Sequence, residues 1–417
     1  MSYSTTNIRP VEPTGRFDLF KPANSKKLRT RMFVLLIASL LSLQTFAQNE
    51  VADKPKSWHL SGYLKYMQTL SGNSFKGDWG TDNLLHNRLK FDWNINQNLS
   101  FKAHMRNRVF YGESVKYIPQ YSQIIDNELG YLDMSEVLFE GKSAFMHSTI
   151  DRLYFDYNYK KFQITMGRQR INWGQTFAWN PNDLFNSASF FDFDYEEKPG
   201  SDAVRIQYYP TYDSKLDLVA KLDHLERKTL AALYRFNAKN TDIQFLGGYY
   251  ADSDYVLGAG FSGALLKGGF RGEFTYFQPK EDFKNAEGKL VASMSYDYTF
   301  ENSLMIQVGA LYNEYGQEDG QFDISEFYFM EASPQQLSLT RWSYMGNLSY
   351  PITPLLNFRF SAMYNPNDDS VYLGPSADYS LKENLDLSIY TQYFTTIDSK
   401  VTNTGGGFLY WRLKWSF

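Results

Sequence analysis

The segment Leu385–Tyr393 reads Leu-Asp-Leu-Ser-Ile-Tyr-Thr-Gln-Tyr, in which apolar and polar side chains mostly alternate. Successive side chains of a β-strand point to opposite faces, so a period of two places the apolar side chains on one face and the polar ones on the other. A helix, with a period of 3.6 residues, would mix the two sets. The segment therefore predicts a strand with one apolar face and one wet face.

Similar segments of roughly ten residues recur from Trp58 to the C-terminus. Eighteen can be counted, starting near residues 58, 83, 98, 149, 161, 202, 214, 228, 241, 254, 266, 289, 303, 341, 355, 371, 385 and 405. Short connections such as Asn96–Gln97 alternate with longer ones near 71–82, 111–148, 169–201, 278–288 and 314–340. Short turns at one end and long loops at the other are typical of outer-membrane β-barrels, whose strand number is even.

We therefore predict an all-β fold, an antiparallel transmembrane barrel over residues 58–417 with about eighteen strands. Sixteen strands also fit, because Pro375 interrupts one segment and the segments around 223–263 are short. A soluble β-sandwich would have shorter strands with an apolar inward face on every one. A propeller would show a blade repeat of about 40–50 residues, and the sequence has no such repeat.

The composition agrees with a sheet that has two unlike faces. Aromatic residues make up 18% of the 417-residue chain, yet the mean hydropathy is −0.46. The absence of cysteine excludes a disulfide framework and thiolate metal sites. The acidic balance, with a sequence pI of about 5.8, gives no support to nucleic-acid binding.

The N-terminus predicts a secretory leader. Lys26, Lys27, Arg29 and Arg31 precede the apolar run Phe33–Leu43, and Thr45-Phe46-Ala47 follows it. A basic region, a short apolar core and small residues before a cleavage site define a signal peptide, whereas a transmembrane helix needs about 20 apolar residues. We expect residues 1–47 to be removed and 48–57 to form a short periplasmic segment. We expect that the polar residues 1–25 reflect a translation start assigned too early.

The last nine residues, Leu409–Phe417, place large apolar side chains on one face and end on an aromatic residue. This strand resembles the C-terminal insertion signal of outer-membrane barrels. The resemblance implies that Trp415 and Phe417 form an assembly signal, with the barrel assembly machinery and outer-membrane lipid as partners.

The inner face of the expected barrel is assigned by the cost of charge in lipid, since a Lys or Arg facing the bilayer midplane costs about 2–4 kcal/mol. This rule predicts a basic pore lining of Arg88, Lys90, Lys102, Arg106, Arg108, Arg152 and Arg205. Only Asp92 and Asp156 oppose them on the same strands. An equally good interpretation is that these basic and acidic side chains pair with one another and serve only to keep the lumen hydrated.

Between two of the expected strands, Gly167-Arg168-Gln169 is followed by Trp173-Gly174. This stretch resembles outer-membrane porins of the alginate-export type, over about twenty residues. The resemblance implies an eighteen-stranded monomeric channel with an arginine-rich constriction that passes an acidic polysaccharide. The aromatic-acidic run Phe190–Tyr195 has no counterpart in that pattern.

The corresponding constriction loop would contain Arg168, Arg170, Trp173, Trp179 and Asp183. If it folds inward, we expect its arginines to add to the positive field and its indole rings to face sugars or carboxylates. The alternative is a loop that plugs the barrel and is held by pairs between Asp183 and its own arginines.

An enzyme is the main rival class, but none of the five histidines has a catalytic signature around it. We expect no catalytic residue, no metal and no cofactor. The sequence therefore predicts a Gram-negative outer-membrane porin for passive diffusion of small hydrophilic or anionic solutes, among them acidic saccharides. A structural or secretion-associated barrel without pore activity is the alternative.

Overall fold

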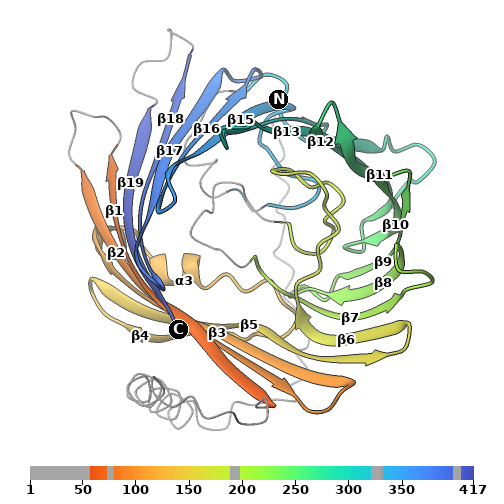
Figure 1. Cartoon of the computed structure of the whole chain (residues 1–417), viewed down its shortest axis with the longest axis horizontal. Coiled ribbons are helices and arrows are strands. Elements are labelled where there is room, and N and C mark those ends of the chain that lie inside the picture. Colours follow the sequence, from red (N-terminus) through yellow and green to blue (C-terminus); the bar gives the residue numbers. More distant parts are fainter. Residues whose placement is uncertain (1–56, 73–78, 188–197, 321–329, 331, 398–404) are drawn as a thin grey trace, which may run out of the picture. The chain divides into compact units, whose positions relative to one another are not determined.

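The computed structural model describes residues 57–72, 79–187, 198–320, 330, 332–397 and 405–417. The chain divides into Met1–Pro55 and Lys56–Phe417. The first unit, which includes the expected leader, lies outside the described residues. The second unit is a ring of antiparallel strands, seen end-on in Figure 1.

The elements of this second unit are almost all strands. In chain order they are β1 (Trp58–Gly72), β2 (Gly80–Asn94), β3 (Leu99–Gly112), α2 (Glu113–Tyr117), α3 (Tyr121–Ile125), β4 (Ser135–Glu140), β5 (Ala144–Tyr159), β6 (Phe162–Gln169), β7 (Ser201–Tyr208), β8 (Ser214–Leu222), β9 (Lys228–Ala238), β10 (Thr241–Tyr250), β11 (Asp254–Leu265), β12 (Gly268–Pro279), β13 (Lys289–Thr299), β14 (Met305–Asn313), β15 (Trp342–Thr353), β16 (Leu356–Asn365), β17 (Ser370–Lys382), β18 (Leu385–Thr396) and β19 (Gly406–Ser416). None of the helices in these segments is long and apolar enough to cross a lipid bilayer.

The sheet closes on itself because β1 pairs with both β2 and β19. β3 pairs directly with β5, so the short β4 is an addition to the wall and the closed ring has eighteen strands. β4 pairs with the part of β5 that β6 does not reach. The prediction of an eighteen-stranded antiparallel barrel is confirmed, and the sixteen-stranded alternative is wrong.

Turn chemistry explains why the short connections could be located. Lys239 and Asn240, between β9 and β10, both have positive φ, as do Leu266 and Lys267 between β11 and β12. Two consecutive residues of this kind make the tight hairpin turn whose twist matches that of the flanking strands. Pro375 does not break β17. The β17–β18 ladder has no pairs between Leu373 and Ser376, which accommodates the missing amide proton.

The two faces of the wall differ as the alternation predicts. Large apolar side chains are exposed on the outer face, among them Leu85, Met166, Leu218, Leu230, Phe245, Leu257 and Val308. Exposed aromatic side chains lie near both ends of the strands. Trp58, Trp93, Tyr157, Phe162 and Trp415 are near the short turns, and Tyr255, Tyr276, Trp342 and Tyr344 are near the long loops. An apolar band between two aromatic girdles is the outer surface of a transmembrane barrel.

Candidate functional site

The structure places the seven bases predicted to line the pore on the inner face of the wall. Arg88 of β2 lies opposite Arg106 of β3, and Arg108 lies opposite His86. Residues directly opposite each other in a ladder point to the same face. Lys90, Lys102 and Arg152 belong to the same face, since His104 pairs with both Lys90 and Arg152 and Lys102 pairs with Asp92. Arg205 of β7 lies opposite Val219, a buried residue of the interior cluster.

Three further bases of this strip come from the strands that close the barrel. Lys65 of β1 lies opposite His86 of β2 and Lys414 of β19, and Arg412 follows on the same face. The sequence analysis did not include them, although the same alternation rule applies, because Arg412 and Lys414 alternate with Trp411, Leu413 and Trp415. We call the bases on the inner face of β19, β1, β2, β3 and β5 the basic strip. They are Lys65, Arg88, Lys90, Lys102, Arg106, Arg108, Arg152, Arg412 and Lys414.

Part of this charge is neutralised by acids that sequence alternation could not place. Arg88 forms an ion pair of 2.7 Å with Asp151, and both side chains are almost completely buried. The β3–β5 register shifts next to Asp151, between Met105–Ile150 and His104–Arg152. A bulge re-aims the side chain of the extra residue, so Asp151 and Arg152 are both buried. Arg205 is likewise paired with Asp217 of β8.

The wall formed by β12 to β18 has few inward charges, and the two arginines among them are paired. Arg271 forms an ion pair with Asp297, and Arg359 with Asp378. The remaining inward side chains are mostly uncharged, such as Gln307, Asn347, Ser361, Ser376 and Gln392. The lumen is therefore asymmetric, with a surplus of bases on one wall and uncharged hydrogen-bonding groups on the other.

The segment 170–186, which we call the inward loop, folds into the barrel from the end of β6 (Figure 1). Its apolar side chains form one cluster with the inner face of β7 to β18. The loop contributes Ile171, Trp173, Trp179, Leu184 and Phe185, each at most 4% exposed. The two indole rings are thus packed into the interior, and the expectation that they face a solute is wrong. Phe177 at the loop tip remains 48% exposed.

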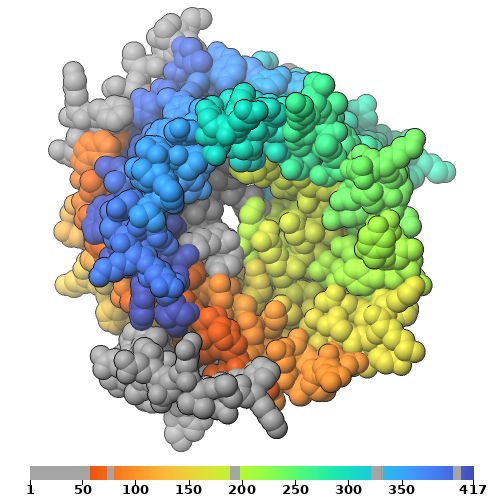
Figure 2. All heavy atoms as spheres, viewed as in Figure 1, coloured from red at the N-terminus to blue at the C-terminus, as the bar shows by residue number. Residues whose placement is uncertain are grey.

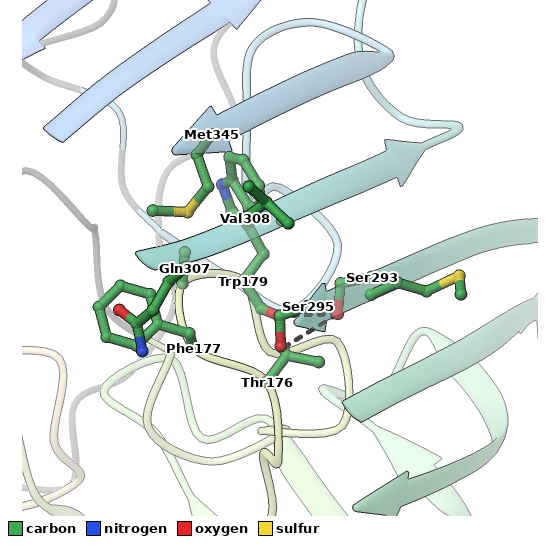
Figure 3. A pocket seen from close by; sticks show the side chains of 11 residues that line it. Thr176, Phe177, Trp179, Ser293, Ser295, Gln307, Val308 and Met345 are labelled. Carbon is green, nitrogen blue, oxygen red and sulfur yellow. Dashed lines mark hydrogen bonds between the residues drawn. The ribbon is translucent and has the colours of Figure 1, made fainter. Parts of the chain in front are cut away.

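Hydrogen bonds to the barrel wall fix the path of the inward loop. The carboxylate of Glu273 on β12 accepts bonds from the backbone amides of Gln175, at 2.8 Å, and Asn182, at 3.5 Å. The hydroxyl of Ser293 on β13 donates to the carbonyl of Trp179 at 2.8 Å, next to Thr176 (Figure 3). Backbone N–H and C=O groups that are buried away from water need hydrogen-bond partners. For the inward loop, side chains of the barrel wall are these partners.

Asp183 lies at the base of the loop and is 4% exposed. Burial raises the pKa of its carboxyl to about 6, although Lys198 and Arg170 and two backbone amides favour the ionised form. No ion pair joins Asp183 to an arginine within the described part of the chain. The inward loop is thus held by apolar packing and by hydrogen bonds to the wall. The alternative prediction, that ion pairs between Asp183 and the loop arginines hold it, is wrong.

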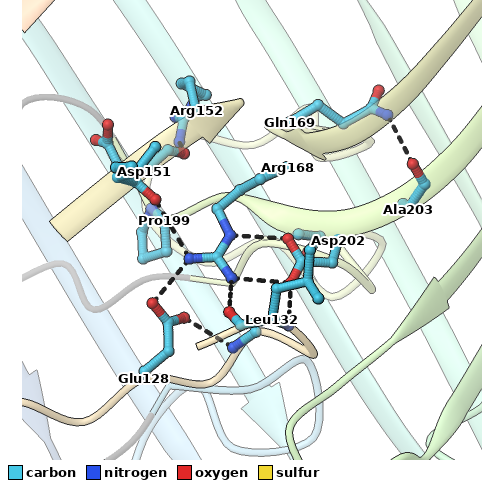
Figure 4. A network of polar contacts seen from close by, with 12 residues as sticks. Glu128, Leu132, Asp151, Arg152, Arg168, Gln169, Pro199, Asp202 and Ala203 are labelled. Carbon is cyan, nitrogen blue, oxygen red and sulfur yellow. Dashed lines mark hydrogen bonds and ion pairs between the residues drawn. The ribbon is translucent and has the colours of Figure 1, made fainter. Parts of the chain in front are cut away.

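Arg168 lies in the wall, at the point where β6 ends and β5 continues. Its guanidinium donates to Asp202 at 2.7 Å and to Glu128 at 2.8 Å, and also to the carbonyls of Leu132 and Ile150 (Figure 4). Two carboxylates neutralise it, so the expectation that Arg168 strengthens the positive field of a constriction is wrong. Arg170, in contrast, is exposed.

The barrel remains hollow beside the inward loop, as the space-filling view shows (Figure 2). One cavity of about 230 Å³ lies between the loop tip and β14 to β18, lined by Phe177, Gln307, Asn347 and Ser361 among others. Another, of about 170 Å³, is lined by Arg106, Arg108, His147 and Arg168 with the 125–130 segment. Among the described residues, no group of three or more acidic or histidine side chains could hold a metal ion.

No family model and no curated protein matches this sequence. Solved structures do match its fold. OccAB4 of Acinetobacter baumannii has a TM-score of 0.54 at 9% identity, over 87% of this chain and all of that one. The outer membrane protein OprD of Pseudomonas aeruginosa has a TM-score of 0.55 at 9% identity, over 88% of this chain and 95% of that one. OccAB1 of A. baumannii has a TM-score of 0.54 at 10% identity, over 89% and 99%.

The barrel therefore has the eighteen-stranded porin fold of the OprD and Occ proteins. At this level of identity the likeness concerns the fold. It gives no specific support to the alginate-export resemblance of residues 167–174.

Proposed function

We propose that this protein is a passive channel of a Gram-negative outer membrane for small hydrophilic solutes, with a preference for anions that include acidic saccharides. The observation that carries the proposal is the basic strip, which faces a lumen whose other walls have mostly neutralised charges. The fold shared with outer-membrane channels supports the class of function.

The apolar outer band and the two aromatic girdles support membrane insertion. A barrel of eighteen strands encloses a lumen wide enough for an aqueous path, whereas eight strands are filled by side chains. The inward loop narrows this path by packing against the inner face of the wall from β7 onward. The remaining path then runs along the basic strip, between Phe177 and the strands that close the barrel.

The sign of the permeating ion follows from the numbers of basic and acidic side chains along this path. The basic strip contains nine bases, and the carboxylates on the same strands, Asp82, Asp92, Asp151 and Asp156, are fewer. Charges set in a low-dielectric wall focus their field into the pore and select the counter-ion. Acid in loops outside the barrel is screened by salt within about 8 Å, so the net charge of −4 does not decide selectivity.

The motif at 167–174 resembles the alginate-export porins, and an acidic saccharide is the kind of solute that a basic strip would favour. In this interpretation the contacts come from the wall, because Arg168 is already paired and Trp173 is buried.

A planar bilayer with a potassium chloride gradient tests the proposal through the reversal potential. We expect measurable conductance and an anion-selective reversal potential. Lys102→Gln should shift it toward zero, because Lys102 faces the lumen. Lys239→Gln, in the tight turn between β9 and β10 and not on a strand, is the matched control and should leave it unchanged. A cation-selective wild type would contradict the anion preference.

The second candidate is a structural or secretion-associated barrel without pore activity. The apolar packing of the inward loop is the observation that favours it, since that packing closes part of the lumen. Reconstituted barrel that conducts no ions, although folded, would support this candidate over the first.

A further inference from the structure

The cavity of about 230 Å³ between the inward loop and β14 to β18 differs in chemistry from the basic strip. We propose that it is a binding subsite for a neutral sugar in its pyranose ring form. This proposal rests on the proposed channel function only for how the sugar arrives.

The subsite is built from hydrogen-bonding side chains in a row across neighbouring strands. Gln307 of β14 lies opposite Asn347 of β15, and Asn347 lies opposite Ser361 of β16. Adjacent strands are about 4.8 Å apart, so these three side chains can contact one small solute together. Ser349 and Ser376 lie in the next row.

Asn347 shows that this row is incomplete without a ligand or water. Both polar atoms of its side chain are buried, and neither has a hydrogen-bond partner among the described residues. Buried amides are normally satisfied, and an exception calls for an explanation. An amide offers both donor and acceptor groups, which matches the hydroxyls of a sugar. Gly374, opposite Ser361, has no side chain, and the phenol of Tyr372 lies over it as part of the lining.

Two features favour an uncharged ring over an anion or an open chain. Arg359, the charged residue in the lining, is held by Asp378 and is therefore neutralised. The ring of Phe177 lies on the loop side of the cavity beside Gln307 (Figure 3). It is 48% exposed, so it offers an apolar face to the C–H face of a sugar ring. Ligand sites commonly combine an apolar surface with a few well-placed polar groups.

Binding is measured first, because it does not depend on conduction. Saturation-transfer NMR of the detergent-solubilised barrel is titrated with glucose, with mannitol as the open-chain control. We expect saturable transfer to glucose and at least fivefold weaker binding of mannitol. Asn347→Ala should weaken glucose binding about fivefold to tenfold, as expected for one hydrogen-bonding group. Phe177→Ala should weaken it by a similar factor.

Asn237→Ala is the matched control, because Asn237 faces the lumen on β9, outside the cavity, and donates to Asp242. It should leave glucose binding unchanged. No saturable transfer, equal binding of mannitol, or equal weakening by Asn237→Ala and Asn347→Ala would each overturn the subsite. Conductance of the same preparation tests the channel separately: binding without conductance supports the subsite and contradicts the passive pore.

Discussion

The indole nitrogen of Trp173 donates a hydrogen bond of 3.0 Å to the carboxylate of Asp217, which is completely buried on β8. The same carboxylate pairs with Arg205 of β7 and lies 3.4 Å from the ammonium of Lys215. One acid therefore neutralises a base of the lumen and anchors the inward loop to the wall. Asp217 therefore affects both the charge that faces the pore, through Arg205, and the width of the pore, through the position of the inward loop.

Trp173→Ala should loosen the inward loop. A buried tryptophan replaced by alanine typically costs about 3–5 kcal/mol, and here the loss falls on the loop cluster. Limited proteolysis should cut the 170–186 segment faster in this variant, while the barrel stays heat-modifiable on gels. Phe177→Ala is the control on the same loop, since Phe177 is half-exposed, and should change the cleavage rate little. Equal protection of wild type and Trp173→Ala would contradict this anchor.

Glu273→Ala should widen the pore. It removes the acceptor of two loop amides, those of Gln175 and Asn182, and an unsatisfied buried donor costs about 1–3 kcal/mol. We expect a larger and noisier single-channel conductance. Glu273→Gln keeps an acceptor oxygen and should have a smaller effect. An unchanged conductance in Glu273→Ala would show that the loop does not limit the path.

The inward loop should be held more firmly in mild acid than at neutral pH. The pKa of Asp183 is raised by burial to about 6, so its ordinary, lower value belongs to the released loop. A raised folded-state pKa gives stability that is present at low pH and lost as pH rises through about 6. A shift of about two units corresponds to on the order of 3 kcal/mol.

Proteolysis rates of the loop between pH 4.5 and 8 measure this effect, with a protease active across that range. Cleavage should accelerate with rising pH in the wild type, and Asp183→Asn should make it nearly independent of pH. Faster cleavage at low pH would give the opposite sign and exclude this role of Asp183.

Arg168→Met should destabilise the wall near the end of β6 without a large change in selectivity. It leaves Glu128 and Asp202 without their shared partner. Breaking a buried pair typically costs about 3–5 kcal/mol. We expect the temperature of the heat-modifiable transition to fall, and the reversal potential to stay close to that of the wild type. A large shift of the reversal potential in a stably folded variant would show that Arg168 does contribute to ion selectivity.

Deletion of Phe417 should reduce barrel assembly. The backbone of Phe417 exchanges hydrogen bonds with Gly62 of β1, at 2.9 and 3.0 Å, where the ring closes. The deletion removes this last closing pair as well as the terminal aromatic residue. The amount of heat-modifiable protein in the outer-membrane fraction measures the effect. Phe417→Tyr retains the aromatic end and should assemble normally. Wild-type levels of folded barrel from the Phe417 deletion would contradict the proposed assembly signal.

The comparison of predicted and observed strands shows how far alternation alone reaches. Most predicted starts lie within a few residues of the observed ones, for example 58, 214, 241 and 385. The exception is 149, since β5 begins at Ala144. The bulge at Asp151 reverses the alternation there, so the residues before it were out of phase with those after it.

The alternation rule gave the side-chain direction of candidate residues on regular strands, but not that of the residues on the loop. Lys90 and Lys102 face the lumen because a strand fixes the direction of every second side chain. Trp173 and Arg168 follow no such rule. Their environment depends on Asp217, Glu128 and Asp202, which are distant in sequence. No local pattern could have indicated those partners.

The sequence by itself determined the barrel, a strand number of sixteen or eighteen, and the inner or outer direction of most wall side chains, because the period of two is a local property of an extended backbone. Only the tertiary structure decided the path of the inward loop, the neutralisation of Arg88, Arg168 and Arg205, and the uncharged row at Asn347. These depend on which strands lie next to each other around the closed ring and on where the loop finds partners for its backbone. Both are contacts between residues far apart in the chain.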